Sequence, residues 1–314
     1  MGVVEIGERS FAAVAAGVLA LLWARDSRAF CQATTCDEKT ETCRMDGACV
    51  AEGAPQHWES RCLSFGVQSA GSPLLHISYR VVDDIMRKAF SQWLNADCGG
   101  GTHPSFHMWD LGAPFGGISC DNPEFNAIKP NANVVMFRDH DWPYEGEKWM
   151  LAQTSTIFDT RTGALLDADI EINSFKQKIT TTDVIAADSQ DLQAILTHET
   201  GHFLGLAHSN EPKATMFHNY QAGDLNYRSL HPDDVKGICA VYPPERAAPM
   251  CIAPSPAHGF SRYCGGGDED GTASVTGCSC STPATKQVPL LAIAGVAAAA
   301  LGAVGRRRRR NGRA

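Results

Sequence analysis

The sequence predicts an α+β fold, because segments with helical periodicity alternate along the chain with segments of strand periodicity. Apolar residues in 81–94 recur every three or four positions, which is typical of an amphipathic helix. Residues 167–173 instead alternate acidic and apolar side chains, which is the period of a half-buried strand. This mixture also leaves an α/β arrangement open as the alternative.

Other segments complete the expected core. Residues 76–81 resemble a strand that leads into the first helix, and Thr162-Gly163 suits a hairpin turn before the acidic strand. A strong helix is expected over 189–204, with either of the two polar residues at 188 and 189 as its N-cap. A last helix is expected over 232–242, with a proline at its start and two acidic residues in its first turn.

The composition describes an acidic globular chain. It has 314 residues, of which 44% are hydrophobic and 20% charged, so wholesale disorder is excluded. The formal net charge is −8, although the arginines at 306–310 and 313 make the end basic and leave the body more acidic still. An acidic body is a poor nucleic-acid surface, and we expect no nucleic-acid partner. The 12 cysteines indicate an oxidising compartment.

Both ends are expected to carry targeting signals. Residues 1–29 resemble a signal peptide, since their apolar run, 11–23, is too short for a comfortable membrane span, although a buried helix is the alternative. Residues 288–304 carry no charge and approach the length of a transmembrane segment. The arginines at 306–310 follow at once, which favours a cytoplasmic location for that end.

Two cysteines, Cys278 and Cys280, directly precede the expected transmembrane segment. Together with the short span and the arginine-rich tail, they resemble the myxobacterial C-terminal sorting signal known as MYXO-CTERM. The resemblance implies that residues 278–314 are a sorting signal cut near the cysteines, and that export and sorting machinery delivers the protein to the bacterial cell surface or outside the cell. A simple tail anchor is the alternative. Ten other cysteines remain, enough for five disulfides of unknown pairing.

Three segments of different composition lie between these ends. Residues 30–62 contain closely spaced cysteines and little aliphatic content, which predicts a small disulfide-stapled lead segment. Residues 63–242 have the composition of a folded core. Residues 243–277 are rich in proline, glycine, serine and acid, which is typical of a stalk. The run 265–271 within the stalk lacks the alternating ligands of a calcium loop and is interpreted as a linker.

The most informative stretch has the pattern H-E-x-x-H-x-x-G-x-x-H and begins at His198. His198 and His202 are four residues apart, so on a helix they project from one face and can bind one metal ion. Glu199 lies beside the first ligand, where it can take a proton from an attacking water. Gly205 lets the chain turn and return His208 to the same ion. Three neutral nitrogens and an open fourth position are typical of catalytic zinc, and unrelated histidines rarely satisfy five fixed positions.

This pattern resembles the metzincin zinc proteases, and its surroundings resemble their matrixin branch. Met216 follows the third histidine by eight residues, as the methionine of the family's Met-turn does, and Ser209 directly follows that histidine. Segments 89–93 and 230–238 resemble the first and last helices of the family. The resemblance covers about residues 72–242.

The resemblance implies a metzincin-type domain with a mixed, mostly parallel sheet, an active-site helix and a C-terminal helix. It implies one catalytic Zn²⁺, a protein or peptide substrate, Glu199 as the general base, and Met216 as support below the site. Three residues are carried over as substrate-pocket positions. Ala194 precedes the first histidine by four residues, His218 replaces the family's usual proline, and Tyr220 matches a family tyrosine.

The sequence also departs from the family. The cysteine motif of the animal propeptide is absent, and the ligands of the animal enzymes' structural zinc and calcium loop cannot be matched. No second zinc is therefore assigned, and Ca²⁺ binding is left open without assigned residues.

Two further groups of residues are weaker metal candidates. Histidines in loop sequence could bind a structural ion, although surface or core histidines are the simpler interpretation: His103, His107 and His140. Acidic residues on one face of the expected strand could favour a cation, although a solvated strand face is preferred: Asp167, Asp169 and Glu171.

Two other functions are alternatives to a protease. A catalytically silent surface binding module on a metzincin scaffold is the main alternative, and intact Glu199 argues against it. A non-proteolytic zinc hydrolase of a small amide is the other. An extended strand able to pair with a peptide would favour the protease, and residues 167–173 are the expected strand.

Overall fold

The computed structural model describes residues 30–37, 41–111, 123, 125, 131–144, 149–219, 221–245, 251 and the backbone of 284–287. Several expected features fall outside these residues: the signal peptide, Tyr220, nearly all of the stalk, both sorting cysteines, and the transmembrane segment 288–304. Within the part of the chain that the structure describes, no helix has the length and apolarity needed to cross a membrane.

A six-stranded sheet, in the order β12-β7-β8-β6-β4-β5, forms the centre of the fold. Every neighbouring pair of strands is parallel except β7 and β8, which form an antiparallel hairpin. The strands are β4 (Cys62–Val67), β5 (His107–Asp110), β6 (Val134–Phe137), β7 (Ala152–Phe158), β8 (Leu165–Ile172) and β12 (Ala284–Gln287). The expected mixed, mostly parallel sheet is therefore confirmed.

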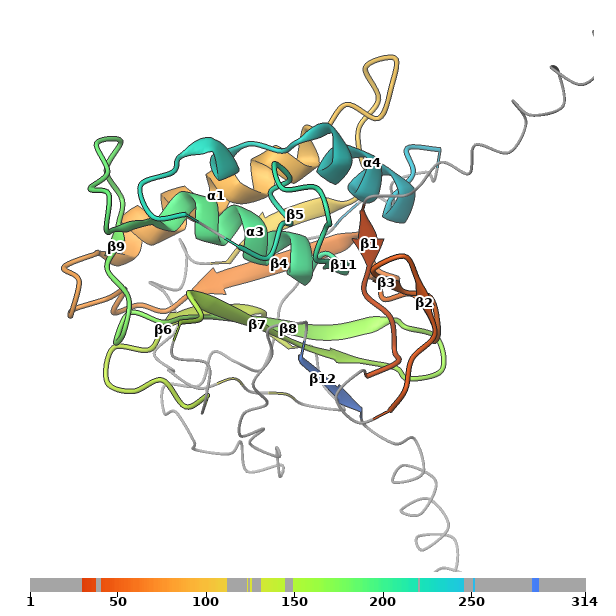
Figure 1. Ribbon diagram of the computed structural model, residues 1–314, viewed down its shortest axis with the longest axis horizontal. Helices are drawn as coiled ribbons and strands as arrows, with labels where there is room; N and C mark the ends of the chain where they lie inside the picture. The colour runs from red at the N-terminus through yellow and green to blue at the C-terminus, as the bar shows by residue number, and fades with distance from the viewer. Residues whose placement is uncertain are drawn as a thin grey trace, which may run out of the picture.

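Two helices, α1 (Tyr79–Leu94) and α3 (Leu192–Phe203), pack together over the sheet (Figure 1). The apolar face of α1 is buried, as its periodicity predicted, and Trp93 is fully enclosed. The Trp93 indole Nε1 donates to Thr197 O and to Thr200 Oγ1, each at 2.9 Å, and so ties α1 to α3.

The expected strand over 76–81 is wrong. Ile77 makes only an isolated bridge with Ser72, and helix α1 begins at Tyr79. His76 has φ of 55°, so the backbone turns here instead of extending. Ser78 then adopts the extended conformation of an N-cap, and a single extended residue before a helix carries no strand.

The expectation of a half-buried, solvated acidic strand is also wrong. In β8 every side chain but that of Leu166 is buried, including Asp167, Asp169 and Glu171. Two of the three carboxylates bond to other protein groups: Asp169 accepts a hydrogen bond from Val134 N at 2.7 Å, and Glu171 pairs with Arg138 and accepts from the Tyr144 hydroxyl. The buried apolar side chains of β8 therefore pack into the hydrophobic core, while polar groups of the protein, and not solvent, cover its acidic face.

The lead segment packs against this core. Its first strand, β1 (Cys31–Gln32), pairs antiparallel with β11 (Leu206–Ala207), while β2 (Met45–Asp46) pairs with β3 (Cys49–Val50). Four disulfides join described cysteines, Cys31–Cys49, Cys36–Cys43, Cys62–Cys251 and Cys98–Cys239. The two other body cysteines, at 120 and 264, lie outside the described residues.

Smaller elements complete the chain. The short strands β9 (Ile179–Thr180) and β10 (Gln190–Asp191) pair in parallel just before α3, and a 3-10 turn, η2 (Asn226–Arg228), follows the histidine motif. The last helix, α4 (Pro232–Val241), begins where the sequence predicts.

The N-terminus of α4 is bonded to a distant turn through Asp234. Its buried carboxylate accepts hydrogen bonds from His231 N at 2.8 Å, Thr215 N at 2.7 Å and Met216 N at 3.0 Å. Burial raises the pKa of Asp234, whereas these three N–H groups stabilise its charged form. The residue therefore fastens the Met216 turn to the helix.

Replacing Asp234 with alanine should lower the free energy of unfolding by about 2–4 kcal/mol, because three backbone donors lose a charged, buried acceptor. Chemical denaturation monitored by circular dichroism would measure the change. Asp224→Ala is the control, since Asp224 caps Asn226 N at the surface and its loss should cost only about 0.5 kcal/mol. Equal effects of the two substitutions would contradict the role of Asp234.

Candidate metal centre

Helix α3 carries the first two histidines of the motif. Its N-cap is Asp191, whose Oδ2 accepts a hydrogen bond from Ala194 N at 2.8 Å. The expected caps, Asp188 and Ser189, lie too early because the chain first forms strand β10. The helix is therefore shorter than expected at its N-terminus but retains both histidines.

The three histidines meet through their Nε2 atoms. His202 Nε2 lies 3.1 Å from His198 Nε2 and 3.2 Å from His208 Nε2. Tetrahedral zinc with Zn–N bonds of about 2.0–2.1 Å places its nitrogen ligands about 3.3 Å apart. The spacing of the three rings therefore fits a single zinc ion.

Hydrogen bonds on the opposite side of two rings fix their orientation. His198 Nδ1 lies 2.7 Å from Thr215 O, and His202 Nδ1 lies 2.8 Å from Leu206 O. A carbonyl only accepts, so each Nδ1 must carry the proton and each Nε2 must be an unprotonated acceptor. Two acceptors at 3.1 Å cannot bond to each other, and a cation between them satisfies both.

The surroundings keep the rings neutral. Burial lowers the pKa of His198 to about 3 and that of His202 to about 4, and burial also lowers the pKa of His208. Neutral imidazole is the form that ligates zinc. The site is thus prepared for a metal at neutral pH without first losing protons.

Glu199 lies beside the ligands with its carboxylate held in place. The Thr154 hydroxyl of β7 donates to Glu199 Oε2 at 2.6 Å. Burial raises the pKa of Glu199 to about 7, which suits a group that accepts and returns a proton near neutral pH. Sequence reasoning missed Thr154, because nothing in its strand distinguishes it from other threonines.

Two glycines allow the site to close. Gly205 has φ of 90°, and a Cβ there would lie 2.5 Å from Gln56 O, so the turn toward His208 requires glycine. At Gly201 within α3, a Cβ would lie 2.2 Å from Met216 Sδ. The expected methionine therefore packs directly against the active-site helix, and it is 2% exposed.

Two of the three expected pocket residues, Ala194 and His218, lie near this centre. Ala194 is buried on α3, one turn before His198. His218 is exposed, and its ring centroid is 6.1 Å from that of His208. Tyr220, Cys278 and Cys280 lie outside the described residues.

The weaker metal candidates, three loop histidines and three acidic residues of β8, do not form a group with metal-ligand spacing within the described part of the chain. Among the described residues, the groups with metal-ligand spacing are the three motif histidines and a Cys36, Glu41 and Cys43 cluster whose cysteines form a disulfide. The remaining candidate histidines, His103, His107 and His140, are exposed, and the first of them contacts Ala96 O at 3.0 Å.

The strand expected to pair with a peptide is not available for that role. β8 is bonded to β7 on one side and to β6 on the other, so residues 167–172 lie inside the sheet. β7 is instead the strand next to the centre, because Thr154 contacts Glu199. Its pairing with β12 starts at Ser155.

The segment that carries the histidine motif is similar to known proteins. The family model described as Matrixin matches residues 130–243. Neutrophil collagenase of Homo sapiens is 32% identical over 44% of this chain and 27% of its own length. Matrix metalloproteinase-C of Caenorhabditis elegans is 32% identical over 59% of this chain and 28% of its own length.

A short, stronger match is to macrophage metalloelastase of Oryctolagus cuniculus, 49% identical over 19% of this chain and 13% of its own length. The chain covers 28% or less of the length of each of these relatives. The expected α+β fold with a mixed, mostly parallel sheet is confirmed, and the segment that supplies the metal centre is similar to the matrixins.

Proposed function

We propose that the protein is an exported, surface-associated zinc endopeptidase that hydrolyses peptide bonds with Glu199 as general base. The observation that carries this proposal is the convergence of three neutral imidazoles beside a buried carboxylate. A closed structural zinc site uses four protein ligands, whereas these three leave a position for a reacting group. The similarity to matrixins supports a peptide or protein substrate.

In this proposal the three histidines bind the metal ion, and Glu199 transfers the proton. His198, His202 and His208 hold the ion, which when bound lowers the pKa of a water molecule and polarises the scissile carbonyl. Glu199 accepts the proton of the attacking water and passes it to the leaving amine. Thr154 holds the carboxylate in one orientation throughout, since it binds a single oxygen, Oε2.

Glu199→Ala should reduce peptide cleavage by about 10²-fold or more while zinc stays bound, because the three imidazoles remain. His202→Ala is the comparison and should lose both zinc and activity. Metal content by atomic spectroscopy and cleavage of a fluorogenic peptide would separate the two effects. A Glu199 variant of near wild-type activity would refute the mechanism.

The buried methyl group of Ala194 leads to a proposal about specificity. In matrixins the residue four positions before the first zinc histidine helps set the depth of the pocket for the side chain just after the cut. Alanine supplies little bulk, so we infer a deep pocket that accepts large apolar side chains. His218, which stands where the family has a proline, is expected to alter the other wall of that pocket; the centroid of its exposed ring lies 6.1 Å from that of His208.

Leu, Met or Phe after the scissile bond should be preferred to Ala by about tenfold or more, because a large buried side chain contributes about 1.5–3 kcal/mol. Ala194→Arg should shrink this preference without changing zinc content. Peptide-library cleavage analysed by mass spectrometry measures both. A wild-type preference for Gly or Ala at that position would show that the pocket is shallow.

Export and surface delivery form a separate part of the proposal. The four disulfides support an oxidising compartment. We expect mature protein from the native host to begin near Phe30 and to lack the segment from 288 onward. Intact mass and terminal sequencing would test this, and a mature form that retains Arg306–Arg310 would favour the tail anchor.

A further inference from the structure

The end of the active-site helix is bonded to the lead segment. A helix leaves its last carbonyls without partners inside the helix. Phe203 O accepts a hydrogen bond from the Trp58 indole Nε1 at 2.8 Å, and Gly205 O accepts one from Ala33 N at 2.9 Å. Two donors from residues 31–58 therefore fix the chain immediately after His202.

The next residues are held by the same segment. Cys31 and Gln32 of β1 pair with Ala207 and Leu206 of β11, so β1 lies alongside the two residues that precede His208 (Figure 1). Leu206 O is also the acceptor that orients His202 Nδ1, at 2.8 Å. One short strand of the lead segment thus supports the stretch that orients one ligand and carries another.

Gln56 links strand β1 to the turn at Gly205. It is fully buried; its Nε2 donates to Thr34 O at 2.7 Å, and its O accepts from Gln32 Nε2 at 2.8 Å. The same oxygen lies where a side chain on Gly205 would be, so the lead segment packs against the turn with no room for a Cβ. A shift of β1 would therefore move the turn as well.

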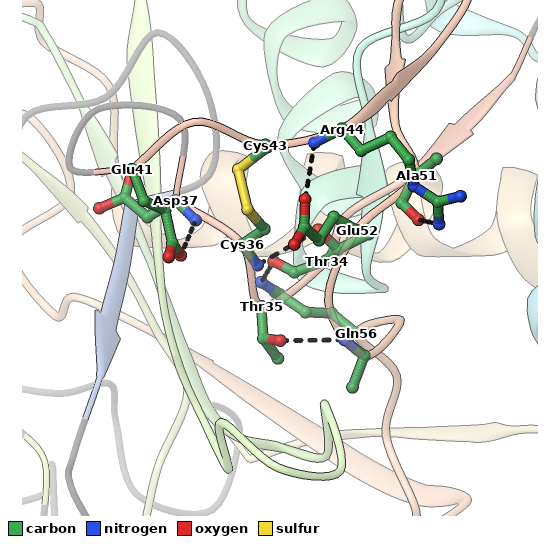
Figure 2. The surroundings of a disulfide bond; sticks show 11 residues. Thr34, Thr35, Cys36, Asp37, Glu41, Cys43, Arg44, Ala51, Glu52 and Gln56 are labelled. Carbon is green, nitrogen blue, oxygen red and sulfur yellow. Dashed lines mark hydrogen bonds between the residues drawn. A yellow bond between two sulfur atoms is a disulfide. The ribbon is translucent and has the colours of Figure 1, made fainter.

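The two disulfides of the lead segment differ in what they hold. Cys31–Cys49 fastens strand β1, because Cys31 is itself paired with Ala207 and is buried. Cys36–Cys43 instead closes a loop at the surface. Figure 2 shows that the bonds around it stay within the lead segment, such as Asp37 N to Glu41 Oε1.

We propose that the lead segment is a positioning element of the metal centre: through β1 and Trp58 it sets the placement of His202 and His208, and the Cys31–Cys49 disulfide locks it there. This inference rests on the proposed zinc function. It means that zinc affinity depends on residues about 150 positions before the ligands.

The test compares two double variants of the full chain, Cys31→Ala with Cys49→Ala and Cys36→Ala with Cys43→Ala. Each removes one disulfide of the same segment. Zinc affinity is measured by competition with a chromophoric chelator, and the visible absorption spectrum of the Co²⁺-substituted protein reports ligand geometry. We expect the first variant to bind zinc about tenfold more weakly with an altered Co²⁺ spectrum, at the low end of the range for lost supporting contacts around a metal, because the disulfide acts on the ligands only through β1.

The Cys36/Cys43 variant should match the wild type in both measurements. Equal behaviour of the two variants, in affinity and spectrum, would overturn the inference. If the Cys31/Cys49 variant does not fold, Trp58→Phe serves instead, because it keeps the aromatic ring near Phe203 but removes the donor to Phe203 O. Trp58→Phe should then alter the Co²⁺ spectrum, and an unchanged spectrum and affinity would again overturn the inference.

These results are separable from the proposed function itself. A wild-type protein that binds no zinc or cleaves no peptide would refute the zinc protease. A wild type that does both, with variants of unchanged affinity and spectrum, would refute only the positioning role.

Discussion

The centre depends on two hydrogen bonds from imidazole Nδ1 atoms to backbone carbonyls. They turn His198 and His202 so that their unprotonated Nε2 atoms face the same point. One acceptor, Thr215, lies in the Met216 turn, and the other, Leu206, lies in the two-residue strand β11. Neither stretch is long enough to fix its own position, so other segments must do so.

The fold supplies that support from opposite ends of the sequence. Asp234 at the start of α4 accepts from the N–H groups of Thr215 and Met216, and so holds the turn below His198. β1 of the lead segment holds Leu206. Burial makes this support necessary, because an imidazole removed from water has no solvent partner for Nδ1 and depends on the carbonyl offered to it.

The sequence predicted the parts of the site that are local. The motif from His198 to His208 fits on one helix and one turn, so spacing alone predicted that the three histidines converge with Glu199 beside them. Thr154, Asp234 and Trp58 were not predicted, because each reaches the centre through tertiary pairing, and a threonine, an aspartate and a tryptophan in those positions have many other uses.

The same limit explains the errors in the fold. Alternating acid and apolar residues indicate two different faces but not what covers the acidic one, so β8 was expected to be solvated, whereas Arg138 and Tyr144 cover Glu171. Hydrophobic periodicity located α1 well, and the proline and two acidic residues located the start of α4. Helix α3, in contrast, begins after Asp191, the last residue of β10, and not after either expected cap. The number of cysteines predicted that the protein has disulfides, whereas the fold was needed to show which cysteines are paired.

Strand β7 links substrate placement to the base in this proposed protease. It lies beside α3, and the hydroxyl of Thr154 contacts both the Glu199 carboxylate, at 2.6 Å, and the Glu199 backbone oxygen, at 3.3 Å. β7 is bonded to β8 along its length and to β12 from Ser155 onward, so the edge of Ala152–Thr154 is the part left for a peptide, and a slip of one residue there would turn every side chain to the other face. Because β7 also fixes the Glu199 carboxylate, a peptide in the correct register presents its scissile bond to a base that is already in position. The entropy cost of ordering that carboxylate is incurred once, on folding, and not in each catalytic cycle.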